Sequence, residues 1–452
     1  MAFKVGLLGL GTVGTGTVKI LLDPSQRHPL IKDLDIHRVG VRSLDKPRDV
    51  VLPGDRLTTD LVSIVTDPEV DIVVELLGGI EPARSLILEA IDNGKHVVTA
   101  NKAVIALHGE EIFSAAAEAG VYVLLEAAVG GGIPVIEPLK QSLCANRITS
   151  ILGIINGTTN YILTRMQEEG ASFLDMLEVA QGLGYAEADP TADVDGWDAA
   201  DKISILASLA FGGRIRRPSV YCEGIRQVTA TDIAYADRLG FVIKLLAQAH
   251  RVNPEPLEGA TPGELPPEQI DIRVHPTLVP KAHPLASVHG VYNAILVEGD
   301  PVGQVMFYGP GAGSGPTASA VVSDVLNIAA LLTVERGKPS SPSVNPGDPV
   351  LDPLLACTHS HYCTIAPMEA TTNRFYVRLQ ANDEPGVIGQ LGTCFGNHGV
   401  SLESVVQLEY TSDRATIVVV THGVREGNFW QALGDITALT CISEVATVLR
   451  VL

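Results

Sequence analysis

Two segments of the sequence combine lysine and carboxylate side chains at spacings that suit proton transfer. The first is Thr99-Ala100-Asn101-Lys102, which follows a short apolar run. The second places six carboxylates between residues 187 and 201 and ends on Lys202. Asp198 and Lys202 are spaced i, i+4 and therefore face each other on a helix. A lysine in a cleft of low dielectric constant can donate a proton to a carbonyl oxygen as hydride arrives, or accept one from an alcohol.

Two other interpretations compete for this second segment. An isolated Asp198–Lys202 pair is commonly only a surface ion pair, but the neighbouring carboxylates suit a cationic or polyhydroxylated ligand and favour a catalytic role. The run Asp193-Val194-Asp195-Gly196 also has the composition of a calcium loop. With Asp193 at loop position 3, however, Lys202 falls at position 12, where an EF-hand needs a Glu. The register excludes an EF-hand.

A glycine-rich turn near the N-terminus predicts a dinucleotide site. Gly9-Leu10-Gly11-Thr12-Val13-Gly14 follows an apolar run and opens a helical stretch. In such a turn Gly9 makes the tight bend, Gly11 lets the backbone approach the pyrophosphate, and Gly14 lets the helix and strand pack closely. Arg42 and Ser43 stand where NAD enzymes usually carry an acidic residue, which favours NADP as the cofactor and leaves NAD possible. The alternative is that Arg42 is a solvated loop residue.

The elements that must position these groups alternate between strand and helix over residues 1–134. The predicted strands are Phe3–Leu8, Ile36–Val41, Asp71–Leu77, His96–Ala100 and Val121–Ala127. Three helices are predicted. The first follows the glycine turn and ends at Leu22, and the other two span Glu81–Asn93 and Gly109–Ala119. This alternation is typical of a doubly wound parallel sheet of the Rossmann type, in which ligands bind at the carboxyl ends of the strands. Lys102 lies at such an end.

The remaining chain predicts a second α/β-containing domain and a separate C-terminal domain. Residues 135–308 are helix-rich and then mixed, which indicates an α+β domain, and residues 309–336 form a glycine turn and an apolar helix. Residues 337–372 contain a Pro/Gly/Ser-rich linker. Residues 373–452 return to strand and helix alternation, with expected elements at Arg374–Ala381, Gly386–Gly396, Val400–Glu409 and Ala415–Thr421.

Composition narrows the classes of protein. The chain has 452 residues, of which 46% are hydrophobic, and 32 basic against 52 acidic side chains give a net charge of −20. A disordered protein is excluded, and so acidic a chain is a poor partner for nucleic acid or anionic membranes. We find no apolar run long enough to span a bilayer and no signal peptide. Six cysteines are too few for a disulfide scaffold, so we expect a cytoplasmic protein.

Six motifs together resemble those of the homoserine dehydrogenases. They are, in order, GLGTVG (9–14), TANK (99–102), EAAVGGGIP (126–134), NGTTNYIL (156–163), GYAEADPTADVDGWDAADK (184–202) and YGPGAG (308–313). The resemblance covers residues 1 to about 335. It implies reduction of L-aspartate 4-semialdehyde to L-homoserine with NAD(P)H in threonine and methionine biosynthesis. It also implies that residues 135–308 form a catalytic and dimerisation domain, and that the protein is a homo-oligomer, a dimer or a tetramer.

The same resemblance assigns roles to individual residues. It makes Lys202 the proton donor, assisted by Asp198, and puts Lys102 beside substrate and nicotinamide. Glu187 and Asp193 would hold the amino and hydroxyl groups of the small-molecule substrate, and Gly309 would join the cofactor site. The carboxylate of Glu126 and the backbone carbonyls of Val129, Gly131 and Ile133 would bind a monovalent cation such as sodium.

The C-terminal segments 382–389 and 397–407 resemble an ACT domain, a βαββαβ module that binds amino acids. Pro385-Gly386 ends a strand and starts a helix whose exposed N–H groups suit a carboxylate. We expect an amino-acid effector, with threonine the natural choice as an end-product, at Asn382, Asp383, Gly386 and Val387. The alternative is a dimerisation module without a ligand. The neighbouring cysteine and histidine cluster, residues 357–363, matches no common zinc spacing, and no metal site is predicted there.

Two other functions remain open on sequence alone. One is a catalytically silent sensor of dinucleotide and amino acid, although a sensor has no need for both lysines and the full acidic motif. The other is a dehydrogenase of a related amino acid, which the same carboxylates could serve.

Overall fold

The computed structural model describes residues 2–252, 269–336, 354, 368–411 and 414–451. The chain divides into two compact units, Met1–Cys357 and Thr358–Leu452, and each is described by itself. Most of the predicted linker 337–372 and the whole cysteine and histidine cluster at 357–363 lie outside the described residues.

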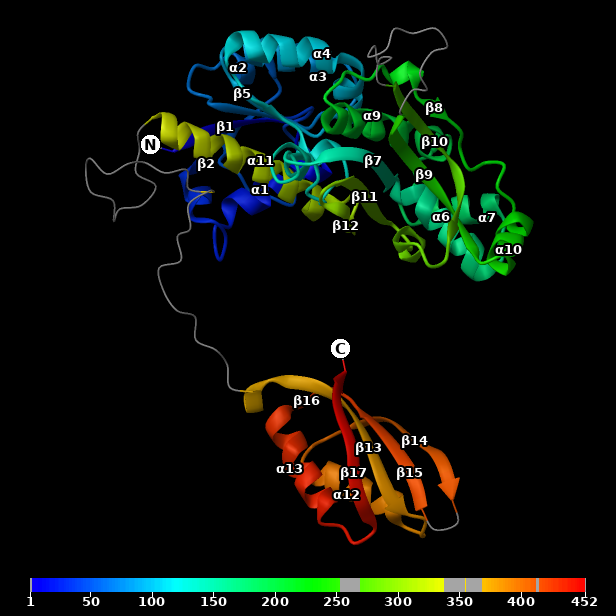
Figure 1. Cartoon of the computed structure of the whole chain (residues 1–452). Coiled ribbons are helices and arrows are strands. Elements are labelled where there is room, and N and C mark those ends of the chain that lie inside the picture. Colours follow the sequence, from blue (N-terminus) through cyan, green and yellow to red (C-terminus); the bar gives the residue numbers. More distant parts are fainter. Residues whose placement is uncertain (1, 253–268, 337–353, 355–367, 412–413, 452) are drawn as a thin grey trace. The chain divides into compact units, whose positions relative to one another are not determined.

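A six-stranded, all-parallel sheet forms the N-terminal part of the first unit (Figure 1). Its strands, in spatial order, are β3 (Leu57–Thr58), β2 (Leu34–Gly40), β1 (Phe3–Leu8), β4 (Ile72–Glu75), β5 (His96–Thr99) and β6 (Val123–Leu124). The connecting helices are α1 (Thr12–Leu22), α2 (Val62–Val65), α3 (Ala83–Asp92) and α4 (Lys102–Ala119). The order of strands reverses between β1 and β4, so the predicted Rossmann-type sheet is confirmed, with its ligand crevice at that point.

Two elements of this sheet differ from the sequence prediction. Helix α4 begins at Lys102 rather than at Gly109 because Asn101 caps it, its Oδ1 accepting the Val104 N–H at 3.3 Å. The last strand is reduced to β6 because residues Glu126–Ala128 form a 3₁₀ turn. Lys102 therefore stands in the first turn of a long, capped helix.

A second, mixed sheet and its helices follow in the same unit. In spatial order its strands are β12 (Gly303–Pro310), β11 (Tyr292–Asp300), β7 (Arg147–Ile154), β9 (Phe241–Val252), β10 (Gln269–Pro280) and β8 (Tyr221–Cys222). The helices are α5 (Ile136–Lys140), α6 (Gly157–Glu169), α7 (Phe173–Gly182), α8 (Thr191–Val194), α9 (Trp197–Phe211) and α10 (Ala230–Arg238). Of the strand pairs only β8–β10 is parallel, so the predicted α+β character is confirmed.

Helix α11 (Ser314–Glu335) returns to the first sheet and lies along α1 (Figure 1). Its Val321, Val325 and Ile328 share a core with residues of β1 and β2. By length and mean hydropathy this helix is long and apolar enough to cross a membrane, so the expectation that no stretch reaches that length is wrong. Two-thirds of its apolar window is buried inside the protein, which explains the composition as that of a core helix.

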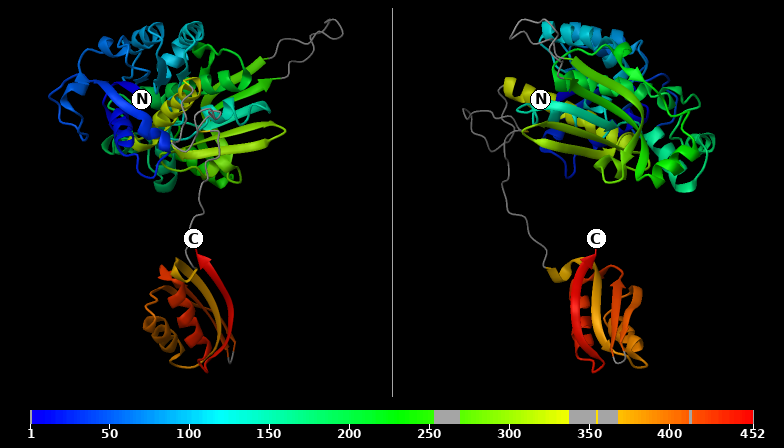
Figure 2. Two further views of the ribbon diagram at one scale, coloured as in Figure 1. Left: turned by 90° about the vertical axis from the view of Figure 1, so that its left-hand side faces the viewer. Right: turned by 45° about the vertical axis from the view of Figure 1, so that its right-hand side comes forward.

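The second unit is an antiparallel sheet with two helices on one face (Figure 2). Its main elements along the chain are β13 (Thr372–Asn382), α12 (Val387–Asn397), β14 (Leu402–Thr411), β15 (Arg414–Thr421), α13 (Glu426–Thr437) and β17 (Ile442–Val451), with the short β16 (Val424–Arg425) pairing at the start of β13. The spatial order of the four long strands is β14-β15-β13-β17. The predicted βαββαβ arrangement is confirmed.

Candidate active site

A single carboxylate, Asp198, joins the two lysines singled out in the sequence. Its Oδ1 lies 2.7 Å from the Nζ of Lys102, and its Oδ2 lies 2.8 Å from the Nζ of Lys202. Asp198 stands in the first turn of α9, where the N-terminal end of the helix dipole favours a negative charge. Lys202 lies one turn further along α9, whereas Lys102 comes from α4, which packs beside α9. The site therefore forms where a helix of the first sheet meets a helix of the second.

Asn156 connects this pair of lysines to a second carboxylate. Its Nδ2 donates to Oδ1 of Asp193 at 2.7 Å and to Oδ2 of Asp198 at 2.9 Å. Its Oδ1 accepts the N–H of Thr159 and thereby caps α6. The buried amide uses both of its N–H groups on carboxylates, so it sets the spacing between them.

The charges of the site shift its pKa values in opposite directions. Burial raises the pKa of Asp198, but the Lys202 and Lys102 ammonium groups outweigh burial and hold this pKa well below the ordinary value. Asp198 in turn raises the pKa of Lys102 against the opposing effect of desolvation. For Asp193, desolvation and then the charge of Asp198 raise the pKa above its ordinary value. Lys102 is thus fixed as a cation, and Asp193 is the more easily protonated of the two acids.

Only two of the six clustered carboxylates contact the lysine site. Asp195 pairs with Arg226, and Asp201 accepts from Nε of Arg217 at 2.5 Å, so these two acids anchor neighbouring segments. Within the described residues the exposed side chain of Glu187 makes no hydrogen bond or ion pair. Its loop is tied to the site through Thr158, whose Oγ1 donates to the Tyr185 carbonyl at 2.7 Å.

The glycine turn lies at the switch point of the parallel sheet and fits a pyrophosphate. Gly9 has φ +112°, and a Cβ there would lie 2.8 Å from the Leu76 carbonyl oxygen. A Cβ on Gly14 would collide with the Gly9 carbonyl, whereas one on Gly11 would meet open space. Gly11 precedes α1 without a side-chain cap, so the free N–H groups of the helix suit an anion. Leu10, Thr12 and Val13 complete this turn.

Two further predicted cofactor residues have defined places. Arg42 is exposed and follows β2, whose last carbonyl, that of Gly40, accepts the N–H of Gly9 at 3.0 Å. Gly309 lies at the end of β12, and the next carbonyl, that of Pro310, accepts the N–H of Gly132 at 3.1 Å. The turn at residues 309–313 therefore packs against the segment predicted to hold a cation.

That segment centres on the buried carboxylate of Glu126. Its Oε1 accepts the N–H groups of Val135 at 2.5 Å and Ile136 at 2.8 Å, and its Oε2 accepts that of Glu137 at 2.7 Å. Burial raises the pKa of Glu126 despite these bonds. Carboxylate oxygens of Glu126, Glu137 and Asp324 lie within 4.8 Å of one another, so the region is rich in the oxygen donors that hard cations prefer.

Comparison with known proteins decides the family. Residues 134–326 match the model of the family described as homoserine dehydrogenase, and residues 9–126 match the model described as homoserine dehydrogenase, NAD binding domain. The chain belongs to the homoserine dehydrogenase family. It is an NAD(P)-dependent oxidoreductase of amino-acid biosynthesis.

Individual homoserine dehydrogenases are similar over nearly the whole chain. That of Synechocystis sp. is 64% identical over 452 residues, covering 100% of both chains, and that of Pseudomonas aeruginosa is 42% identical, covering 99% of this chain and 98% of the relative. The crystal structure of a homoserine dehydrogenase from Thiobacillus denitrificans has a TM-score of 0.67 at 43% identity, covering 100% of this chain and 98% of that one. A hyperthermophilic archaeal homoserine dehydrogenase in complex with NADPH has a TM-score of 0.59 at 26% identity, covering 74% of this chain and 98% of that one.

Sequence reasoning missed one central residue of this homoserine dehydrogenase site. Asn156 lies in the motif NGTTNYIL, to whose residues we assigned no individual role. Its position directly after β7, at the start of a helix that packs against α8, is the signal that could have marked it. The amide both caps α6 and bridges two acids.

In the second unit, the four residues predicted to bind an effector line one cavity. Asn382, Asp383, Gly386 and Val387 surround a volume of about 200 Å³, together with Gln407 and Ile417. Gly386 adopts φ +96° and precedes α12 without a side-chain cap. The first N–H groups of α12 have no partner within the helix, and their residues line this cavity. Its volume is large enough for a small amino acid.

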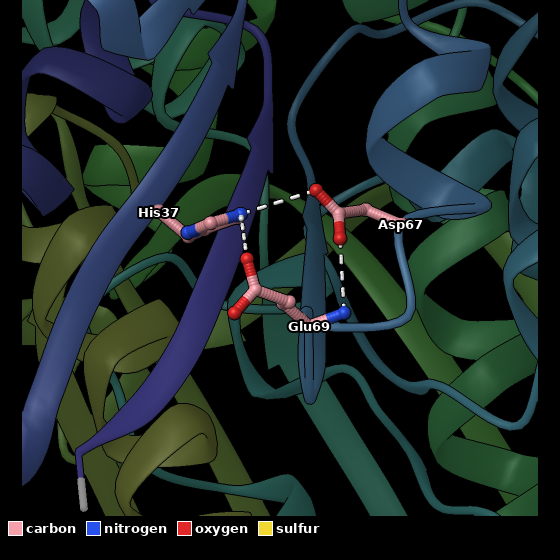
Figure 3. A group of neighbouring side chains, drawn as sticks. All are labelled: His37, Asp67 and Glu69. Carbon is pink, nitrogen blue, oxygen red and sulfur yellow. Dashed lines mark hydrogen bonds and ion pairs between the residues drawn. The ribbon is translucent and has the colours of Figure 1, made fainter.

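A second cluster of titratable side chains lies away from the site (Figure 3). His37 of β2 directs its Nε2 to Oδ2 of Asp67 at 3.1 Å and to Oε2 of Glu69 at 3.9 Å. Asp67 and Glu69 precede β4, at the edge where strands begin, whereas ligands bind at the carboxyl edge. Lys4 neutralises Glu69 at 2.5 Å, so the cluster is a structural ion-pair network of the sheet.

Proposed function

We propose that the protein reduces L-aspartate 4-semialdehyde to L-homoserine with NADPH. The observation that carries this proposal is the bridge from Lys102 through Asp198 to Lys202, beside the crevice of a nucleotide-binding sheet. Such a site offers two lysine side chains to an aldehyde oxygen and carboxylates to an amino group. These are the two ends of an amino-acid semialdehyde.

Lys202 is suited to donate the proton. Of the three N–H bonds of its ammonium group, one points to Oδ2 of Asp198 and one to the carbonyl oxygen of Ile155, at 2.7 Å. The third is available to an aldehyde oxygen. A nicotinamide bound in the crevice would supply the hydride for the aldehyde carbon. Lys202 transfers a proton to the oxygen, which yields the alcohol, and the lysine regains its proton from solvent.

Lys102 and the acids orient the substrate. The side chain of Lys102 is 38% exposed, and its ammonium group remains charged next to Asp198. It can therefore attract the carbonyl oxygen as negative charge develops. Asp193, half-buried and held by Asn156, would accept the substrate's ammonium or hydroxyl group. The exposed Glu187 would close on the amino group from its loop.

The residues of the nucleotide crevice support NADPH as cofactor. Gly9, Gly11 and Gly14 leave room for the pyrophosphate, and Lys102 and Gly309 would border the nicotinamide end. The guanidinium group of Arg42, exposed at the end of β2, would pair with a 2′-phosphate. NADH would bind without this contact.

A monovalent cation such as sodium fits the oxygen donors near Glu126. The backbone carbonyls of Val129, Gly131 and Ile133 would supply most ligands, because the Glu126 carboxylate already accepts three N–H groups and would contribute mainly its charge. The cation would tie this segment to the turn at Gly309.

For the second unit we propose the regulatory role of an ACT domain. A small amino acid, threonine as the pathway's end-product, would place its carboxylate on the N–H groups at Gly386 and Val387 and its ammonium group on Asp383. The volume of about 200 Å³ is large enough for a small amino acid.

Assembly and compartment complete the proposal. Met306 and Tyr308 expose apolar surface on β12 of the second sheet, and this surface supports a homo-oligomer. The four cysteines among the described residues are free thiols, as expected in the reducing cytoplasm. Light scattering after size exclusion, on wild type and on Tyr308→Asp, measures the assembly.

One assay tests the catalytic proposal. The purified protein is mixed with aspartate 4-semialdehyde and NADPH, and the loss of NADPH absorbance is followed, with NADH as a second cofactor. Turnover with formation of homoserine is expected. NADPH binding without turnover of any semialdehyde would instead identify a sensor, and preference for a different semialdehyde would identify a related dehydrogenase.

A further inference from the structure

We propose that Glu75 is a positioning residue for Lys102, an inference that rests on the proposed function of Lys102. Glu75 is the last residue of β4, next to the point where the strand order reverses, and its exposed fraction is 0%. In the described part of the chain its carboxylate contacts no basic side chain. Burying a carboxylate without a basic partner is costly, so its hydrogen bonds must replace the lost hydration.

Both oxygens of Glu75 lead to Asn101, the cap of α4, by separate routes. Oε2 accepts the hydroxyl of Thr99 at 2.7 Å, and the Thr99 oxygen accepts the N–H of Asn101 at 3.0 Å. Oε1 accepts the N–H of Leu77 at 2.7 Å, which fixes the loop that ends at Gly79. The Gly79 carbonyl accepts Nδ2 of Asn101 at 2.7 Å. The two routes close a ring around the residue before Lys102.

The direction of each hydrogen bond in this ring is determined by backbone groups. The N–H groups of Leu77 and Asn101 can only donate. Thr99 Oγ1 accepts the N–H of Asn101 and donates its own proton to Oε2 of Glu75, so both oxygens of Glu75 act as acceptors. An amide at position 75 has one acceptor and one donor group, and it would leave one buried donor of the ring without a partner.

The ring matters for catalysis because α4 carries Lys102 in its first turn. Asn101 Oδ1 accepts the Val104 N–H, so the ring fixes the cap and the cap fixes the start of the helix. From this position the Nζ of Lys102 lies 2.7 Å from Oδ1 of Asp198. Disturbing the ring should shift the start of α4 and loosen the Lys102–Asp198 pair, while Lys202 and its own helix stay in place.

The test compares Glu75→Gln in two backgrounds. In the wild type we expect kcat to fall about tenfold, which corresponds to about 1.4 kcal/mol, with the NADPH dissociation constant little changed. In a Lys102→Ala background the same change should lower kcat by less than about twofold, because the residue through which Glu75 acts is gone. Glu118→Gln, an exposed acid on α4, is the matched control.

A second readout needs no substrate and separates this inference from the proposed function. Reductive ¹³C-methylation reports the pKa of Lys102 by NMR, with the signal assigned by its loss in Lys102→Ala. Asp198 raises this pKa in the wild type, so Glu75→Gln should move it down toward the ordinary value. Thr99→Val should reproduce the shift and Thr99→Ser, which keeps the hydroxyl, should not.

Three results would overturn the inference. They are an equal loss of kcat in both backgrounds, a loss confined to NADPH affinity, and an unchanged Lys102 pKa in both Glu75→Gln and Thr99→Val. If Glu75→Gln does not fold, the Thr99→Val and Thr99→Ser pair decides by the same measurements. If the wild type does not turn over the semialdehyde, the proposed function fails and the NMR readout still decides the role of Glu75.

Discussion

Lys102, the first residue of α4, lies 2.7 Å from Asp198, the second residue of α9, so one ion pair joins the starts of two helices from different domains. Lys202 contacts the other oxygen of the same carboxylate. The positions of both lysines therefore depend on one buried acid. The predictions that follow address the groups around this acid and the binding sites on either side.

Replacing Lys202 with Ala should nearly abolish turnover. Without a proton donor the developing alkoxide is not neutralised, and such donors typically contribute about 100-fold or more to the rate. The NADPH dissociation constant, measured by fluorescence, should remain unchanged. Lys281→Ala, an exposed lysine paired with Asp237, is the control and should keep wild-type kcat. A Lys202→Ala enzyme with more than about a tenth of wild-type kcat would show that the proton comes from elsewhere.

Arg42→Glu should weaken NADPH much more than NADH. The change removes a charge-assisted hydrogen bond and adds a repelling carboxylate, so we expect at least a tenfold rise in the KM for NADPH, or about 1.4 kcal/mol. Steady-state kinetics with both cofactors measure it. Arg27→Glu, at an exposed arginine after α1, should change neither value. An equal rise in KM for NADPH and NADH would show that Arg42 does not bind the 2′-phosphate.

Asp193→Asn should stabilise the protein and impair substrate binding. Desolvation and Asp198 raise the pKa of Asp193, so its folded form binds protons more readily than its unfolded form. This contribution to stability increases as pH falls, and at neutral pH the ionised group opposes folding. We expect a higher Tm for the variant at neutral pH, together with a KM for substrate raised by about tenfold or more.

The pH dependence gives the same variant a second test. In the wild type the KM for substrate should rise on the acid side at a pH above the usual range for Asp, as Asp193 becomes protonated. The variant should lack this limb. An unchanged acid limb in Asp193→Asn would assign the titration to another group.

Lys244→Met should change how stability depends on alkaline pH. Lys244 is 1% exposed, donates to Asn160 Oδ1 at 3.0 Å and the Val288 carbonyl at 2.6 Å, and burial lowers its pKa to about 8. Between that pKa and the ordinary 10.5, the unfolded state binds more protons, so this lysine makes unfolding harder as pH rises, by up to about 1.4 kcal/mol per pH unit. Urea unfolding at about pH 7 and about pH 9.5 should show this gain in the wild type relative to the variant. Parallel curves for the two proteins would contradict the lowered pKa.

Threonine should inhibit the full-length enzyme through the cavity of the second unit. Asp383→Ala should shift the inhibition midpoint by about tenfold or more, because the effector's ammonium group loses its partner, and leave kcat without threonine unchanged. Titrations at subsaturating substrate measure the midpoint, with Glu444→Ala, an exposed acid on β17, as the control. Inhibition with an unchanged midpoint in Asp383→Ala would move the effector to another site.

The parts of the site that sequence could predict are those set by local spacing. Asp198 and Lys202 are one helical turn apart, and the glycine turn follows a strand directly, so periodicity and motif sufficed for both. The Lys102–Asp198 contact depends on packing between α4 and α9, and no local pattern encodes it. The family resemblance placed Lys102 beside the substrate, but its contact with Asp198 was not predicted.

What the sequence could not predict lies mostly in buried polar networks. Neither Asn156 nor Glu75 was assigned a role from the sequence, because their contacts are with partners up to 42 residues away. The start of α4 was also missed, although Asn101 is a good capping residue and Lys102 and Ala103 are strong helix formers. The exposed Glu187 remains a prediction from the resemblance.

The contact of α11 with α1 has a consequence for synthesis of the chain on the ribosome. Gly16 of α1 leaves room for α11, since a Cβ there would lie 2.5 Å from the Ser314 carbonyl oxygen and 2.9 Å from the Ala318 Cβ. Ser314 Oγ also donates to the Thr12 carbonyl at 2.8 Å. The apolar face of the first sheet is therefore covered by a helix that is translated some 300 residues later. Until α11 leaves the exit tunnel the nascent N-terminal half exposes that face, so ribosome-associated chaperones have a defined surface and a defined interval in which to act.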